Sequence, residues 1–324
     1  MSAILVTGGA GFIGSHLCDR LLDMGKKVVC IDNLNSYYSP KRKIQNIQHN
    51  FDNKNFTFIS IDIQKKDQLE LVFKRHKISQ IIHLAARAGV RPSIEKPLWY
   101  KDTNVSGTLN LLELAKQYKA EQFIFASSSS VYGNNTKIPF SEDDNVDKPI
   151  SPYAASKKAC ELFCYTYSHL CKLNVTCLRF FTVYGPRGRP DMIPIMYPHR
   201  ISQGTYIKMF GDGTTKRDYT YIGDILDGII AALKKPFKFE IINLGNNKPV
   251  QLKYFISLVE KNLGKKAKIK KLPIPPGDVE VTFADISKAK KLLNYKPKVS
   301  IEEGMKKTID WYKKNIQTPK GDKK

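Results

Sequence analysis

The strongest constraint on the fold of this chain is a glycine-rich stretch at residues 4–14. It follows a short apolar run, residues 3–6, and precedes an amphipathic segment, residues 12–24, which together predict a buried strand, a tight turn and a helix. Glycine is required where a backbone turns sharply, approaches a ligand closely or lets a helix lie against a strand. The glycines at these places are Gly8, Gly11 and Gly14. The peptide amides that open the helix, at Phe12 and Ile13, would then face a pyrophosphate.

A carboxylate follows where such a turn would place a ribose. Residues 27–31 predict a second strand, which ends in Asp32. A carboxylate there can accept hydrogen bonds from a ribose diol and repels the additional phosphate of NADP, so the pattern favours NAD. Asn33 and Asn35 lie in the polar loop that follows, where ligands bind in open α/β sheets. The alternative is a glycine turn that joins a strand to a helix without any ligand.

Two further predicted strands end in candidate binding residues. Residues 56–61 lead to Asp62 and Ile63, where a carboxylate could accept a hydrogen bond from an adenine amino group. Residues 80–84 lead to small side chains, which let a cofactor lie against the backbone. The residues at this end are Leu84, Ala85 and Ala86, followed by Arg87 and Arg91. These two arginines either lie on the surface or contact an anionic substrate.

Four consecutive serines, residues 127–130, follow a predicted strand at 122–126 and offer hydroxyl groups to a ligand. A serine-rich turn is the simpler interpretation of this segment alone. Tyr153 and Lys157 lie four residues apart in a predicted helix, so they share one helix face. An ammonium group beside a phenol favours the ionised phenol, which can act as a general base near neutral pH.

The composition excludes several classes of protein. The chain has 324 residues and a net charge of +23, which suggests acidic partners. Its lysines are dispersed and not interleaved with aromatic residues, so we expect solvated surface lysines and no nucleic-acid partner. The six cysteines form no C-x-x-C pair, so we expect no metal site and a reduced, cytoplasmic setting. No apolar run reaches the roughly 18 residues that a membrane span needs.

Alternating strands and helices predict an α/β fold, a Rossmann-type doubly wound parallel sheet, over residues 1–181. Proline and glycine become frequent beyond this point, which predicts a smaller C-terminal α/β lobe for the substrate at residues 182–316. A predicted strand at 239–245 would rejoin the first sheet. We expect residues 317–324 to form a disordered tail.

Together these residues resemble the extended short-chain dehydrogenase/reductases, and among them the nucleotide-sugar epimerases. The resemblance covers nearly the whole chain. Besides the glycine turn, the serine segment and Asp32, it depends on Asp62-Ile63, His83-Leu84-Ala85-Ala86, Asn104, Val131-Tyr132-Gly133, Tyr153-x-x-x-Lys157, Arg217-Asp218-Tyr219 and Pro276-Gly277-Asp278.

The resemblance implies an enzyme that keeps NAD bound and inverts C4 of a UDP-hexose through a transient 4-keto sugar, with no net redox change. Tyr153 would remove the proton from the 4-hydroxyl, Ser128 would hydrogen-bond that oxygen, and Lys157 would bind the nicotinamide ribose. The implied cofactor-binding residues are Gly8, Gly11, Phe12, Ile13, Gly14, Asp32, Asn33, Asn35, Asp62, Ile63, Leu84, Ala85, Ala86, Asn104, Tyr153 and Lys157.

The resemblance also bears on the substrate. Relatives that dehydrate the sugar carry an Asp-Glu pair after the catalytic Thr, and relatives that decarboxylate it carry a Glu at the second place. Here these places are Ser129 and Ser130, as expected of an epimerase. Residues 83–93 and 188–192 resemble UDP-glucuronate 4-epimerases, in which hydroxyls and an arginine, here Arg189, meet the C6 carboxylate. The expected substrate contacts are Arg87, Arg91, Ser129, Ser130, Arg189, Arg217, Asp278 and Thr282, with Arg217 on the diphosphate.

Two residues differ from the pattern of the UDP-glucuronate 4-epimerases, so other sugars are alternative substrates. Arg187 stands where that branch usually has Trp, and a small residue at Thr282 resembles epimerases that admit 2-N-acetyl groups. UDP-N-acetylglucosamine and UDP-glucose are therefore alternative substrates. A noncatalytic protein that binds NAD and a polyanion is an alternative of another class, as is a net reductase. The resemblance further implies a homodimer, in which residues 104–118 and 153–170 form a four-helix bundle with their symmetry mates.

Overall fold

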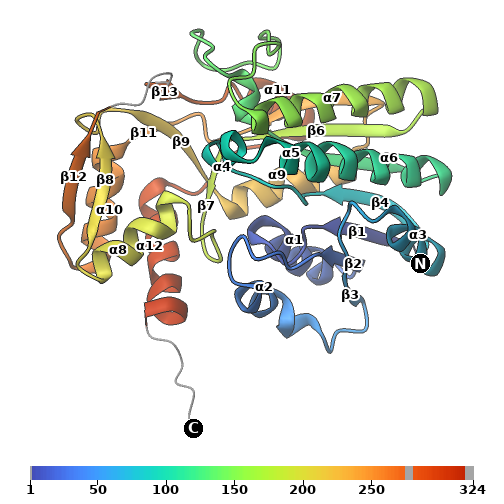
Figure 1. Ribbon diagram of the computed structural model, residues 1–324, viewed down its shortest axis with the longest axis horizontal. Helices are drawn as coiled ribbons and strands as arrows, with labels where there is room; N and C mark the ends of the chain where they lie inside the picture. The colour runs from blue at the N-terminus through green and yellow to red at the C-terminus, as the bar shows by residue number, and fades with distance from the viewer. Residues whose placement is uncertain (1, 274–279, 318–324) are drawn as a thin grey trace.

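The computed structural model describes residues 2–273 and 280–317, which contain a seven-stranded parallel sheet (Figure 1). The strand order is β10-β6-β5-β4-β1-β2-β3. The strands are β1 (Ala3–Thr7), β2 (Lys27–Asp32), β3 (Phe56–Ser60), β4 (Ile78–His83), β5 (Gln122–Ser128), β6 (Asn174–Phe180) and β10 (Phe239–Leu244). The order reverses between β1 and β4, which is the point where open α/β sheets bind ligands. The predicted Rossmann-type sheet is confirmed.

Helices cover both faces of this sheet. Side chains of β1 are therefore buried on both faces, which explains why its sequence is apolar without alternation. Ile4 and Val6 pack into the cluster that includes α1 (Phe12–Asp23) and α9 (Ile222–Lys234). Ala3 and Leu5 point to the other face, where they pack into the cluster that includes α3 (Lys66–Arg75), α6 (Gly107–Gln117) and α7 (Pro152–Cys171). Strands buried on both faces read as continuous apolar runs.

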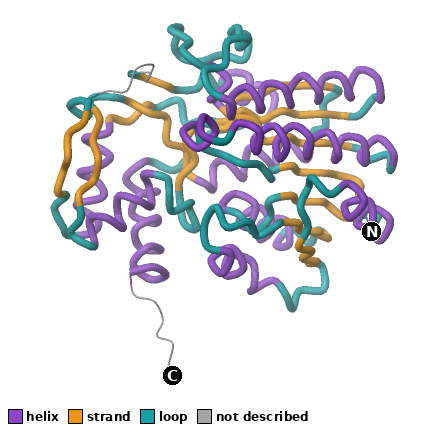
Figure 2. The backbone as a smooth tube through the Cα atoms, viewed as in Figure 1, coloured by secondary structure: helices purple, strands orange, loops and turns teal. Residues whose placement is uncertain are grey.

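A second lobe follows β6 and contains two smaller sheets (Figure 2). One is formed by β7 (Thr182–Tyr184), β9 (Lys216–Tyr221), β11 (Pro249–Gln251) and β13 (Val281–Thr282), and the other by β8 (Tyr206–Phe210) and β12 (Lys268–Leu272). Its helices include α8 (Ile193–Ser202), α10 (Leu252–Leu263) and α12 (Ile301–Tyr312), whereas α11 (Ser287–Leu293) packs against α9 and β10 of the large sheet. Tyr197, Phe255 and Met305 lie in the core of this lobe. Between β9 and β11 the chain returns to the large sheet, where β10 pairs with β6.

Short elements connect these layers. They are α2 (Pro40–Ile47), α4 (Val90–Glu95), α5 (Pro97–Tyr100), the 3-10 turns Gln48–Asn50 and Ser129–Tyr132, and the π-helical turns Lys101–Ser106 and Lys313–Gln317. Gln317 therefore ends a helical turn, and the remainder of the predicted tail lies outside the described residues. Within the described ranges, the structure contains no helix with the length and apolar character required to cross a membrane.

The glycine turn after β1 is required by sterics. Gly8 has a φ of +66°, and a Cβ atom there would lie 2.8 Å from the backbone nitrogen of Ala85. At Gly14, a Cβ atom would lie 2.3 Å from the carbonyl oxygen of Gly8. Only glycine allows the first turn of α1 to pack this closely on the end of β1.

Candidate active site

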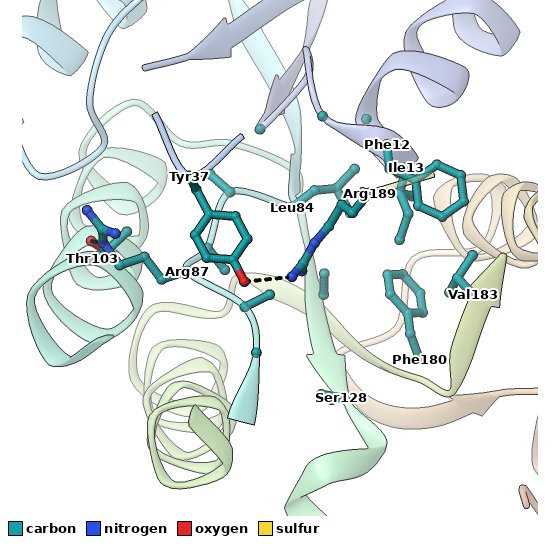
Figure 3. A pocket seen from close by; sticks show the side chains of 18 of the residues that line it. Phe12, Ile13, Tyr37, Leu84, Arg87, Thr103, Ser128, Phe180, Val183 and Arg189 are labelled. Carbon is teal, nitrogen blue, oxygen red and sulfur yellow. Dashed lines mark hydrogen bonds between the residues drawn. The ribbon is translucent and has the colours of Figure 1, made fainter. Parts of the chain in front are cut away.

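A cavity of about 440 Å³ lies at the carboxyl ends of the central strands (Figure 3). Its wall is formed by the loops after β1, β2, β4 and β5, by the start of α7, and by residues that follow β6. Predicted site residues on this wall are Gly8, Gly11, Phe12, Ile13, Gly14, Asp32, Asn33, Asn35, Ile63, Leu84, Ala85, Ala86, Arg87, Ser128, Ser129, Ser130, Tyr153, Lys157 and Arg189.

Asp32 lies at one end of the cavity and is held by the backbone. Its carboxylate accepts hydrogen bonds from the amides of Ala10, at 3.2 Å, and Leu34, at 2.9 Å. Burial raises the pKa of Asp32, and the nearby Lys43 ammonium opposes that shift. A fixed carboxylate beside amides of the glycine turn provides acceptors for a ribose diol and donors for a pyrophosphate. This end of the cavity therefore fits a dinucleotide.

The polar loop after β2 completes this end. Asn33 donates from Nδ2 to the Asp62 carboxylate at 2.8 Å and accepts from the Asn35 amide at 3.1 Å. Asn33 and Asn35 line the cavity, whereas Asp62 is not among the residues of its wall. In the described structure Asp62 thus fixes Asn33 and lies behind it.

Ser128, Tyr153 and Lys157 all line the same cavity. Ser128 is the last residue of β5, so this strand continues into the serine segment further than the predicted end at residue 126. Lys157 is 3% exposed, and its Nζ donates to the carbonyl oxygen of Ala126 at 2.6 Å. This hydrogen bond ties α7, which carries Tyr153, to the end of the strand that carries Ser128.

A buried ion pair lies behind the serines. Ser127 Oγ donates to Glu161 Oε1 at 2.5 Å, and both carboxylate oxygens of Glu161 accept from Arg179 at 2.9 Å. The side chains of Glu161 and Arg179 are each only 1% exposed. Arg179 also donates to Tyr132 Oη at 3.0 Å. This network joins α7, β5 and β6, and the sequence analysis did not identify it.

Asn104 stabilises the loop after β4, and the buried His83 is the last residue of that strand. Asn104 is 2% exposed, accepts from the Arg87 amide at 2.8 Å and donates to Ser156 Oγ at 2.9 Å. It is not among the residues of the cavity wall, so the contacts described here connect the loop with α7. Burial, together with the charge of Lys157, lowers the pKa of His83 to about 3, which keeps this imidazole neutral.

The predicted substrate residues divide into two groups. Arg87, Ser129, Ser130 and Arg189 line the cavity, whereas Arg91, Arg217 and Thr282 are not among the described residues of its wall. The guanidinium of Arg91 lies over the Phe210 ring, 5.1 Å from its centroid. Arg217 on β9 donates to the carbonyl oxygen of Lys216 and pairs in register with Thr282 on β13. Asp278 lies outside the described residues.

Arg189 contacts two residues that the sequence analysis did not identify. It donates from Nε and Nη2 to the two carboxylate oxygens of Asp191, at 3.0 and 2.6 Å. Its Nη2 also approaches Tyr37 Oη at 3.3 Å, the contact drawn in Figure 3. Tyr37 Oη in turn donates to Asp191 at 3.0 Å. The three side chains join the loop after β2 to the loop after β7.

Across residues 2–273 and 280–317, no three His, Cys, Asp or Glu side chains are grouped so that they could hold a metal ion.

The model of one protein family, described as GDP-mannose 4,6 dehydratase, matches residues 5–308. The chain belongs to this family. The expected place among the extended short-chain dehydrogenase/reductases is thereby confirmed. Three comparisons show which members it is similar to.

A UDP-glucuronate 4-epimerase from Thermodesulfobacterium geofontis is 50% identical, over 98% of both chains. The crystal structure of a UDP-glucuronic acid 4-epimerase from Bacillus cereus, in complex with UDP-glucuronic acid and NAD, is 41% identical with a TM-score of 0.90 and covers 96% of this chain and 99% of that one. A Thermotoga maritima UDP-glucose 4-epimerase with UDP-glucose is 33% identical, with a TM-score of 0.88 over 96% and 99% of the two chains.

Proposed function

We propose that this protein is an NAD-dependent UDP-hexose 4-epimerase. The observation that carries the proposal is that Ser128, Tyr153 and Lys157 line the same cavity as the glycine turn and Asp32. The first group can move a proton at a sugar hydroxyl, and the second fits a dinucleotide. The glycine turn and Asp32 would hold NAD, which would supply a hydride acceptor and donor for the sugar carbon.

The side chains of this protein supply the position and the proton transfer. Tyr153 removes the proton from the 4-hydroxyl and returns it, and Ser128 hydrogen-bonds the same oxygen. Lys157 holds its ammonium group at the end of β5 through Ala126, where it would bind the nicotinamide ribose. Holding reacting groups in this geometry lowers the entropic part of the barrier.

The proposed substrate pair is UDP-glucuronate and UDP-galacturonate. Two features support an acidic sugar: hydroxyl groups at Ser129 and Ser130, and guanidinium groups at Arg87 and Arg189, all on the cavity wall. A carboxylate is bound strongly by arginine through charge-assisted hydrogen bonds. The serine pair also carries no acid that could drive dehydration, so epimerisation is favoured although the family description names a dehydratase.

We expect the purified protein to interconvert UDP-glucuronate and UDP-galacturonate without added reductant and without net formation of NADH. The measurement is chromatographic or NMR identification of products from a panel that also holds UDP-glucose and UDP-N-acetylglucosamine. If only the neutral sugars are turned over, the proposed substrate is wrong but the proposed reaction is retained. Stoichiometric consumption of free NADH or NADPH would show a net reductase and contradict the proposal.

We further propose a homodimer formed by α6 and α7, which pack side by side on one face of the sheet (Figure 1). Large apolar side chains on α7 are exposed, with Leu162 at 56% and Leu170 at 70%, and Leu98 on the adjoining α5 is 70% exposed. Large exposed apolar side chains on adjoining helices favour a protein interface on this face. Light scattering is expected to give about twice the chain mass of 36.8 kDa. A monomeric mass at micromolar concentration would contradict this proposal.

The cysteines support a cytoplasmic setting for the enzyme. All six are free thiols, and five of them are buried. Buried thiols without disulfides are typical of proteins in reducing compartments.

A further inference from the structure

Asp191 binds the edge of the Arg189 guanidinium to which a substrate carboxylate would bind. A carboxylate binds arginine most strongly in a two-pronged arrangement along one edge of the guanidinium plane. In this structure the edge formed by Nε and Nη2 is taken by both oxygens of Asp191. Tyr37 completes the arrangement, because its hydroxyl bonds Asp191 and its ring lies 5.2 Å from the guanidinium carbon.

The position of this pair distinguishes it from the other two-pronged Arg–carboxylate pair described above. The Arg179 and Glu161 side chains are each 1% exposed, so separating them would leave a charge buried. The Arg189 side chain is 19% exposed and that of Asp191 is 38% exposed. Asp191 can therefore turn toward water when it leaves Arg189, at a small cost in free energy. The Arg179–Glu161 pair therefore stays together, whereas the carboxylate that pairs with Arg189 can be replaced by another.

The charge of the pair supports the same conclusion. Although burial acts in the opposite direction, the hydrogen bonds from Arg189 lower the pKa of Asp191. Asp191 is therefore a carboxylate at neutral pH and compensates the charge of Arg189 on the cavity wall. A neutral sugar gains little from displacing it, whereas a sugar acid can replace it with an equivalent set of hydrogen bonds.

We propose that Asp191 is a resident counter-ion of Arg189 that yields this arginine to the carboxylate of an acidic UDP-sugar. It then acts as a specificity-determining residue, because it competes with the sugar carboxylate and does not compete with a neutral hydroxymethyl group. This inference rests on the proposed function, since it takes Arg189 as the group that receives the sugar acid.

The test is the nearly isosteric variant Asp191→Asn in the full-length, NAD-loaded protein. Calorimetry would measure the Kd of UDP-glucuronate and of UDP-glucose in the Tyr153→Phe background, which prevents turnover. Loss of the competing charge is expected to tighten UDP-glucuronate binding about fivefold, the order of one exposed ion pair. The Kd of UDP-glucose is expected to remain within about twofold of its value without the substitution. The ratio of the UDP-glucose Kd to the UDP-glucuronate Kd therefore rises.

The matched control is Asp227→Asn, which adds the same charge far from this pair. Asp227 pairs with Arg20 at 3.2 Å and is not among the residues of the cavity wall. It should leave the ratio of the two dissociation constants unchanged. A parallel shift in Asp227→Asn would assign the effect to net charge and overturn the proposal.

Other outcomes separate this inference from the proposed function. Weaker or unchanged binding of UDP-glucuronate to Asp191→Asn would mean that Asp191 orients Arg189 and does not compete for it, which overturns the inference alone. If protein with Tyr153 intact epimerises only neutral sugars, the proposed substrate is wrong. If UDP-glucuronate binds neither to the protein with Asp191 nor to the Asp191→Asn variant, the inference is overturned together with the proposed substrate.

Discussion

Tyr153→Phe is expected to lower kcat by about 100- to 10,000-fold, the usual contribution of a positioned general acid–base group. The change removes only the hydroxyl oxygen, and the ring packs edge-on against Tyr100, 6.2 Å away between centroids. Lys157 keeps its hydrogen bond to Ala126, so the end of β5 and the start of α7 should stay in place. The KM and the amount of NAD that copurifies should therefore change little.

The measurement is steady-state kinetics on the sugar pair that the substrate panel identifies, with bound NAD determined after denaturation. Tyr254→Phe is the matched control, because Tyr254 is an exposed tyrosine on α10 whose hydroxyl donates to Glu302. It should retain full activity. Near-normal turnover by Tyr153→Phe would remove Tyr153 as the base. Loss of NAD from the variant would show that the hydroxyl acts in cofactor binding.

The second large effect concerns stability. Glu161→Leu is expected to lower the free energy of unfolding by about 3–5 kcal/mol, because the Arg179 charge would remain buried without its partner. Ser127 would also lose the acceptor of its hydroxyl, at 2.5 Å in the present structure. Urea denaturation, followed by circular dichroism, measures the change.

Two comparisons make this prediction specific to burial. The variant Asp310→Asn breaks an exposed pair with Lys306, whose side chains are 55% and 69% exposed, and should change stability by at most about 0.5 kcal/mol. The double variant Glu161→Leu with Arg179→Met should be more stable than Glu161→Leu alone, since no charge is left unpaired. Equal losses at residues 161 and 310, or additive losses in the double variant, would contradict the assignment to an unpaired buried charge.

Local patterns account for most of the predicted architecture. The strand, glycine turn and helix at residues 3–24 are determined by short-range sterics, since the backbone at Gly8 and Gly14 leaves no room for a Cβ atom. The parallel sheet follows from apolar strands that alternate with amphipathic helices, and this prediction is confirmed. The predicted epimerase class agrees with the similar proteins that the comparisons found.

The limits of the sequence analysis appear at residues whose partners are distant in the chain. Arg91 and Arg217 are arginines near binding motifs, yet Arg91 lies over Phe210 and Arg217 donates to the carbonyl oxygen of the distant Glu280. Neither partner follows from spacing along the chain. Glu161 was detectable in principle, because it continues the helix face of Tyr153 and Lys157 by one more turn. Its partner Arg179 comes from a different strand.

The sequence by itself determined the dinucleotide-binding turn, the helix face that carries Tyr153 and Lys157, and the order of strands and helices, because each depends on contacts between near neighbours in the chain. Only the tertiary structure decided which of the arginines line the cavity, which strand of the large sheet β10 pairs with, and that Asp191 and Tyr37 hold Arg189. These depend on how two lobes meet across the ends of the strands. The free energy of such contacts comes from burial and charge pairing between segments that are far apart in sequence.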